Sequence, residues 1–204
     1  MRLIGMPDSP YVRRVAVSLR FMGVPFTHEA VSVFRHYDQF AAINPVVKAP
    51  TLVTDDGTTL MDSTLILDYA ERLIPAERRL SPVGLPEFAR AQRLIGLALA
   101  AAEKSVQIIY ERTLRPVEKQ HQPWLDRVRG QVLAAYRLLE DEVGVRETWL
   151  FGDRPLQADI SVAVIWSFTQ SAIADTVVAA DHPALSLFAK RAEALPEFRA
   201  FAPA

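Results

Sequence analysis

The 204-residue sequence contains no cysteine, and this absence excludes several kinds of chemistry. Such a chain forms no disulfide, holds no metal through thiolates and has no cysteine nucleophile of its own. Any sulfur chemistry on this protein therefore needs a thiol that a ligand supplies. We also expect no metal centre, because three of the histidines lack the spacing of metal ligands and are interpreted as structural: His28, His121 and His182.

A large excess of charge and long hydrophobic runs are lacking as well. The formal net charge is −1, so the chain has no basic excess of the kind that binds nucleic acid. No stretch approaches the ~18 consecutive apolar residues of a membrane span, and the N-terminus has no apolar run typical of a signal peptide. We therefore expect a cytoplasmic protein without nucleic-acid or membrane partners. Hydrophobic residues make up 50% of the chain, which is enough to form a buried core.

The first part of the chain alternates between strand-like and helix-like stretches. Apolar residues recur at helical spacing in residues 11–22, and Gly23-Val24-Pro25 ends that helix. The patterns predict strands at residues 3–6, 26–32, 51–54 and 59–61 and helices at residues 11–22, 36–43 and 62–73. This order, β-α-β-α-β-β-α, indicates a mixed sheet with helices on its faces, as in a thioredoxin-like fold. We assign this domain to residues 1–76.

Strand signals end after a stretch rich in proline, residues 75–86, which we interpret as a linker. Beyond it the periodicity predicts helices at residues 88–110, 124–143, 159–174 and 183–194. The third of these is apolar nearly all round, so we expect it to be the buried central helix of a bundle. The predicted fold class is thus α/β plus all-α, with an all-helical C-terminal domain at residues 84–204.

Ser9-Pro10-Tyr11 lies between the first predicted strand and the first predicted helix. Ligands of open α/β sheets bind beyond the carboxyl ends of strands, and helix N-termini favour anions. Ser9 is therefore placed to present its hydroxyl beside the positive end of a helix. A serine that only caps the helix, followed by proline in the first turn, explains the same residues equally simply.

Two further stretches have the residue types of a peptide-binding site. In the stretch of residues 44–52, a proline opens a strand, and a cis Ala49-Pro50 bond would turn the N–H and C=O of Ala49 away from the sheet. Those groups could then pair with an extended peptide, although an ordinary trans turn remains open. Asp62-Ser63 begins the third predicted helix, where Ser63 suits a ligand carboxylate and Asp62 an ammonium group. Simple capping explains this pair as well.

Taken in order, these stretches resemble the glutathione S-transferase superfamily, in its bacterial, serine-type form. The resemblance consists of Ser-Pro-Tyr at 9–11, Asn-Pro-x-x-Lys-x-Pro-x-Leu at 44–52 and an acidic residue followed by serine at 62–63. Residues 152–160 and the His182-Pro183 and 195–198 segments are similar to the family's helical half. The resemblance implies a homodimeric enzyme that uses glutathione as co-substrate.

The resemblance also implies roles for individual residues. Ser9 would stabilise the glutathione thiolate, Ala49 with Pro50 would hold the cysteinyl backbone, and Asp62 with Ser63 would hold the γ-glutamyl end. Lys48 and His36 are weaker candidates for the glycyl carboxylate, with surface or packing roles equally open. The second substrate should lie in an apolar cleft between the domains, and its candidate walls are Met6, Tyr11, Phe34, Ile109, Tyr110 and Arg112.

Two positions depart from the family pattern. Leu156 stands where the family usually has a serine or threonine cap, so we expect Asp159 to cap that helix instead. Ser9 stands where related bacterial proteins often have cysteine, and serine forms no mixed disulfide. Serine therefore points toward conjugation or thiolate-dependent reduction, and the resemblance implies transfer of glutathione to a small hydrophobic electrophile, with detoxification as its setting. A glutathione-dependent peroxidase, isomerase or dehalogenase on the same site, or a non-catalytic glutathione-binding adaptor, stays open.

Overall fold

The computed structural model describes residues 1–203, which divide into two compact units. The first unit comprises Met1–Leu80 together with residues 194–203, and the second comprises Ser81–Glu193. Arg13 joins the chain end to the first unit, because its guanidinium donates to the carbonyl oxygens of Phe201 (2.9 Å) and Phe198 (3.3 Å). The domain bounds 1–76 and 84–204 stay a prediction.

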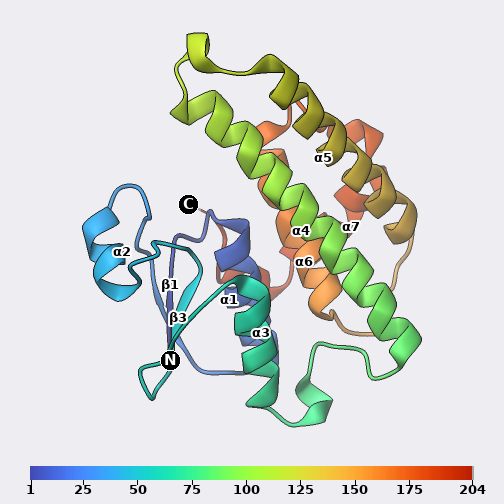
Figure 1. Cartoon of the computed structure of the whole chain (residues 1–204). Helices are drawn as coiled ribbons and strands as arrows, with labels where there is room; N and C mark the ends of the chain where they lie inside the picture. Colours follow the sequence, from blue (N-terminus) through green and yellow to red (C-terminus); the bar gives the residue numbers. More distant parts are fainter. Residues whose placement is uncertain (204) are drawn as a thin grey trace. The chain divides into compact units, whose positions relative to one another are not determined.

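The first unit is a mixed sheet with helices on both faces, as the thioredoxin-like prediction requires (Figure 1). The strand order is β2-β1-β3-β4, in which β1 pairs parallel with β2 and antiparallel with β3, and β3 pairs antiparallel with β4. Its elements are β1 (Arg2–Ile4), α1 (Pro10–Met22), β2 (Thr27–Glu29), α2 (Tyr37–Ile43), β3 (Thr51–Val53), β4 (Thr59–Met61), α3 (Ser63–Arg72), the 3-10 turn η1 (Ala76–Arg78) and α8 (Pro196–Arg199).

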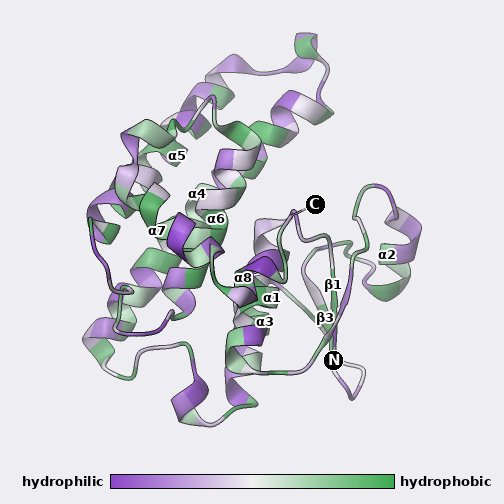
Figure 2. Cartoon of the chain, turned by 180° about the vertical axis from the view of Figure 1, so that it is seen from behind, coloured by the Kyte–Doolittle hydropathy of each residue, from purple (hydrophilic) through white to green (hydrophobic). Residues whose placement is uncertain are grey.

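Helices α1 and α3 pack beside each other on one face of the sheet, and α2 lies on the other face (Figures 1 and 2). Beneath α2 a small core forms from Ile4, Val31 and Phe40, all of which are buried. Ala49 packs against the edge of this core. Burial of these apolar side chains therefore holds β1 and the chain around Ala49 together.

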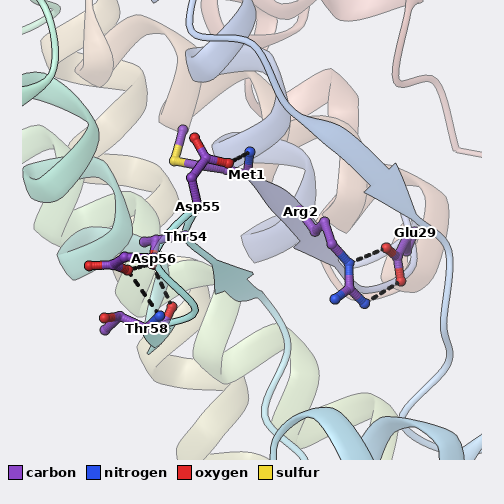
Figure 3. A network of polar contacts seen from close by, with 7 residues as sticks. All are labelled: Met1, Arg2, Glu29, Thr54, Asp55, Asp56 and Thr58. Carbon is purple, nitrogen blue, oxygen red and sulfur yellow. Dashed lines mark hydrogen bonds and ion pairs between the residues drawn. The ribbon is translucent and has the colours of Figure 1, made fainter.

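The end of the sheet at which β1 begins carries a network of polar contacts (Figure 3). The N-terminal ammonium lies 2.6 Å from the carboxylate of Asp55, in the turn after β3. Arg2 and Glu29 form an ion pair across the parallel strands β1 and β2 at 2.5 Å. Exposed pairs of this kind contribute at most about 1 kcal/mol each. They lie at the beginning of β1, whereas the predicted ligand site lies beyond the end of that strand.

The second unit is entirely helical. Its elements are α4 (Leu85–Leu114), the 3-10 turn η2 (Val117–Lys119), α5 (Gln122–Val143), α6 (Gln157–Ile173), the 3-10 turn η3 (Ala179–Asp181) and α7 (Pro183–Glu193). Most of α6 is buried, and α4 and α7 pack against it, which confirms the predicted central helix. Helix α4 begins earlier than the expected residue 88, because Pro86 fits the first turn, where no N–H is needed. Hydrophobic and hydrophilic residues alternate along α5, as in an amphipathic helix (Figure 2).

None of the helices within residues 1–203 is both long and apolar enough to cross a membrane.

Candidate functional site

Ser9 is the N-cap residue of α1. Its Oγ accepts a weak hydrogen bond from the backbone N–H of Val12 at 3.4 Å, and Pro10 occupies the first turn. A serine hydroxyl has two lone pairs and one O–H, so capping uses an acceptor position and leaves the O–H able to donate. Ser9 is also partly exposed. The hydroxyl can therefore cap α1 and donate to a ligand anion at the positive helix end at the same time.

Gly5 brings three parts of the site together, although the sequence analysis did not single it out. It follows β1 with a φ of 140°, a backbone conformation that favours glycine. A Cβ at this position would lie 2.5 Å from Val12 Cγ2 and 3.2 Å from the Cβ of Ala49. The end of β1, the first turn of α1 and Ala49 therefore lie in close contact. His28 Nε2, from β2, lies 2.8 Å from the Gly5 carbonyl oxygen and helps to hold it.

The chain around Ala49 is arranged as a peptide-binding site needs. The Ala49-Pro50 bond is cis. Among the backbone hydrogen bonds within residues 1–203, none uses the N–H or C=O of Ala49. Buried Asn44 supports the loop from below, since its Nδ2 donates to Thr51 Oγ1 at 2.9 Å. Both polar groups of Ala49 are thus available to an extended ligand backbone.

Asp62 and Ser63 form the start of α3. Asp62 has a φ of 70° and is exposed, and its Oδ1 accepts from the N–H of Thr64 at 2.9 Å. The second carboxylate oxygen remains available for an ammonium group. Ser63 is buried, and its hydroxyl accepts from Nη1 of Arg14 at 2.9 Å. The pair therefore offers one acidic and one hydroxyl group at a helix N-terminus.

Arg14 is the second residue that sequence reasoning missed. Its side chain is only 1% exposed, and its Nη1 also donates to Thr64 Oγ1 at 3.2 Å. Burial lowers the pKa of Arg14 to about 10, against the attraction of the Asp62 carboxylate, so the guanidinium stays charged at neutral pH. Helical periodicity treats a charged residue as solvent-exposed, and only the position of α3 beside α1 reveals this contact. Helix α1 thus presents Ser9 to the predicted ligand site and is joined to α3 through Arg14.

The two weaker candidates for the glycyl carboxylate, His36 and Lys48, are both exposed. His36 precedes α2, is exposed, and uses its Nδ1 to accept from the N–H of Ser32 at 3.2 Å. Lys48 is exposed in the loop before Ala49, and its carbonyl oxygen accepts from Thr51 Oγ1 at 2.7 Å. Both stay predictions for the glycyl carboxylate.

The residues predicted for the second substrate divide between the two units. Tyr11 and Phe34 belong to the first unit, where Phe34 is 58% exposed. Tyr110 and Arg112 lie on α4 of the second unit, where Tyr110 is 43% exposed. Arg112 is held by Asp175, with Nη1 2.9 Å from its carboxylate. Their joint role remains a prediction.

Within residues 1–203 no group of three or more histidine, cysteine, aspartate or glutamate side chains is arranged to hold a metal ion.

A small mixed sheet flanked by helices and joined to an all-helical unit defines a thioredoxin-like protein with a C-terminal helical domain. The chain belongs to the glutathione S-transferase superfamily. Residues 3–78 match the family model described as glutathione S-transferase, N-terminal domain, and residues 122–200 match the corresponding C-terminal domain.

Similar proteins support this membership. A glutathione S-transferase from Methylobacterium radiotolerans in complex with glutathione sulfonate is 27% identical, with a TM-score of 0.91 over 99% of this chain and 94% of that one. A glutathione transferase family member from Pseudomonas fluorescens with bound S-(propanoic acid)-glutathione is 29% identical, with a TM-score of 0.83 over 100% of both chains. The maleylacetoacetate isomerase of Pseudomonas aeruginosa is 28% identical over 154 residues, which span 72% of this chain and 71% of the isomerase.

Proposed function

We propose that this protein is a glutathione transferase that binds glutathione as its thiolate and transfers it to a small hydrophobic electrophile. The observation that carries the proposal is the Ser9 hydroxyl, which caps α1 as an acceptor and keeps its O–H for a ligand. Similar structures described with glutathione, glutathione sulfonate or S-(propanoic acid)-glutathione support the choice of thiol. Because the chain has no cysteine, the reacting sulfur must come from that ligand.

The chemistry follows from the pKa of the thiol. A free thiol has a pKa of about 8.5, so only a few per cent is thiolate at neutral pH. The Ser9 O–H and the N-terminal end of α1 both favour the anion, and a pKa lowered by about two units corresponds to roughly 2.7 kcal/mol. The proton leaves on binding, the thiolate attacks the electrophilic carbon, and the leaving group departs with the electron pair of its bond. Ser9 donates a hydrogen bond and forms no covalent bond.

The remaining site residues position the tripeptide in this proposal. Ala49 pairs through its N–H and C=O with the cysteinyl backbone, next to Pro50. Asp62 pairs with the γ-glutamyl ammonium group, and the helix end at Ser63 receives the γ-glutamyl carboxylate. Lys48 and His36 are placed toward the glycyl end.

A glutathione-dependent isomerase is a second candidate function, favoured by the similarity to maleylacetoacetate isomerase. Both functions use the same thiolate, but an isomerase returns glutathione unchanged while a transferase consumes it. Measurement of free thiol during turnover separates them: a fall in thiol equal to product formed supports transfer, and constant thiol supports isomerisation. A screen of electrophiles, hydroperoxides and cis double bonds identifies the class of second substrate.

Replacement of Ser9 by alanine tests the proposal. We expect Ser9→Ala to bind glutathione nearly as tightly as the wild type and to lose about 10- to 100-fold in kcat at pH 7, since less bound thiol is ionised. Ultraviolet absorbance of the bound thiolate, followed against pH, should show its pKa shifted up by one to two units. A wild-type rate and an unshifted titration in the variant would falsify the role of Ser9.

Two control variants separate the hydroxyl from the helix cap. Ser9→Thr keeps both the hydroxyl and a capping side chain, so its activity should stay near that of the wild type. Ser9→Gly removes the hydroxyl at a capping cost of only a few tenths of a kcal/mol, less than the ~1 kcal/mol of alanine. If loss of the hydroxyl is the cause, glycine and alanine variants lose the same activity although their stabilities differ.

We also propose that the protein is a homodimer. Exposed apolar side chains on β4 and α3, Met61 and Leu65, support this proposal, and Leu65 is 65% exposed. Sedimentation at micromolar concentration should give twice the mass of the chain, and Leu65→Glu should shift it to the monomer. A monomeric wild type would contradict the proposal. The cytoplasmic location and a role in detoxification stay predictions.

A further inference from the structure

Arg14 is a charged residue inside the first unit, and its burial requires an explanation. The guanidinium lies in α1 and is 1% exposed, so water does not solvate it. Burial of a charge is unfavourable unless hydrogen bonds and opposite charge compensate. Arg14 donates to two consecutive hydroxyls at the start of α3, Ser63 Oγ at 2.9 Å and Thr64 Oγ1 at 3.2 Å, and the Asp62 carboxylate adds attraction.

The two hydroxyls that accept from Arg14 differ in burial and in their position on α3. Ser63 is buried beside Asp62, and because its oxygen accepts from Arg14, its own O–H points away from Arg14 and can donate to a different group. A hydroxyl that accepts from a charged donor is polarised and becomes a stronger donor. Thr64 is exposed and lies one position further along α3. Arg14 thus fixes Ser63 as a donor at the place where α3 begins.

We infer that Arg14 is a positioning residue for the γ-glutamyl carboxylate: from its buried place in α1 it orients the Ser63 hydroxyl toward that carboxylate and supplies positive charge behind it. The inference rests on the proposed function, since glutathione is the ligand. It assigns a role to a residue that touches no substrate atom and acts through Ser63. The measurable consequence is therefore a preference of the protein for glutathione over a tripeptide that lacks the γ-glutamyl α-carboxylate.

The experiment compares two tripeptides by calorimetry. One is glutathione, and the other is 4-aminobutanoyl-cysteinyl-glycine, which keeps the ammonium group, thiol and glycine but lacks the γ-glutamyl α-carboxylate. The wild type should prefer glutathione by about tenfold or more, as expected for loss of a charge-assisted hydrogen bond. In Arg14→Met, which keeps much of the apolar volume, we expect that preference to fall to about twofold or less, while the affinity for the second tripeptide stays within a factor of about three.

Companion variants distinguish positioning from a structural role. Ser63→Ala should lose the same preference, and the double variant should lose no more than either single variant, because Arg14 acts through Ser63. Thr64→Val removes the other hydroxyl that accepts from Arg14, and its preference should equal that of the wild type. Arg14→Lys keeps the charge and should retain more of the preference for glutathione than Arg14→Met. If Arg14→Met does not fold, Arg14→Lys takes its place in the comparison of the two tripeptides.

The outcomes separate cleanly. If Arg14→Met and Arg14→Lys weaken both tripeptides equally, the residue only holds the fold and the inference is wrong. If the preference for glutathione survives in Arg14→Met, it is also wrong. If the wild type binds glutathione without any preference over the second tripeptide, the carboxylate is not recognised here, although the proposed transferase stands. Failure of the wild type to bind either tripeptide contradicts the proposed function itself.

Discussion

Asp159 Oδ1 lies 2.8 Å from the backbone nitrogen of Leu150, nine residues earlier in the chain. The other carboxylate oxygen accepts from the N–H of Leu156 at 2.9 Å, at the first turn of α6. One buried carboxylate thus satisfies two backbone donors and joins the loop to the central helix. The bond from the Leu156 N–H is the half of a capping box that the third helical residue supplies, so Asp159 contributes to the start of α6 as expected from the sequence.

Replacement of Asp159 should therefore change both stability and its pH dependence. Asp159→Ala leaves two buried N–H groups without their acceptor, and we expect a loss of about 2–4 kcal/mol in the free energy of unfolding at pH 7. Burial raises the pKa of Asp159 from 3.8 to about 6, so the folded state favours the protonated form. The contribution of this group to stability is thus greatest below pH 4 and falls as the pH rises to about 6, by about 3 kcal/mol in all.

The comparison with Asp159→Asn isolates this titration, because asparagine does not ionise. The free energy of unfolding of the wild type minus that of Asp159→Asn, from urea denaturation between pH 4 and 7, should decrease as the pH rises. A difference that is flat or increases with pH would contradict the assignment.

Gly5 should not tolerate a side chain. In Gly5→Ala the φ of 140° is strained and the new Cβ meets Val12 Cγ2 at 2.5 Å, so α1 or the Ala49 loop must move. We expect a loss of about 1–3 kcal/mol in stability and at least about tenfold weaker glutathione binding. Gly57→Ala is the matched control, since its φ is 87° and its Cβ meets nothing within 4 Å. Gly57→Ala should lose stability but keep its affinity for glutathione. Equal glutathione affinity in Gly5→Ala and Gly57→Ala would count against the proposed location of the site.

Asp62 should contribute to glutathione affinity through its charge. We expect Asp62→Ala to bind glutathione about 10- to 100-fold more weakly by calorimetry, since an ammonium–carboxylate hydrogen bond is lost. Asp62→Asn keeps an oxygen for the N–H of Thr64 and so retains the cap while removing the charge. It should bind as weakly as the alanine variant and be more stable. Unchanged affinity in Asp62→Asn would show that capping is the whole role.

Local sequence signals predicted most elements because their causes are local. Gly23 ends α1 with a φ of 64°, and the turn with Gly57 separates β3 from β4, as predicted. Strand β2 is shorter than the predicted residues 26–32, since only Thr27–Glu29 finds a partner in β1. Pairing, and not β propensity, limits a strand.

The amino-acid sequence by itself determined the order of elements, the thioredoxin-like class and the buried character of α6, and it predicted the three stretches that we propose bind glutathione. These follow from periodicity, capping and turn residues, which act over a few positions. Only the tertiary structure decided that Arg14 lies beneath Ser63, that Gly5 is closed in by Val12 and Ala49, and that Arg13 joins the chain end to the first unit. Those contacts join residues far apart in the chain, and the compensation of a buried charge depends on which groups the fold places around it.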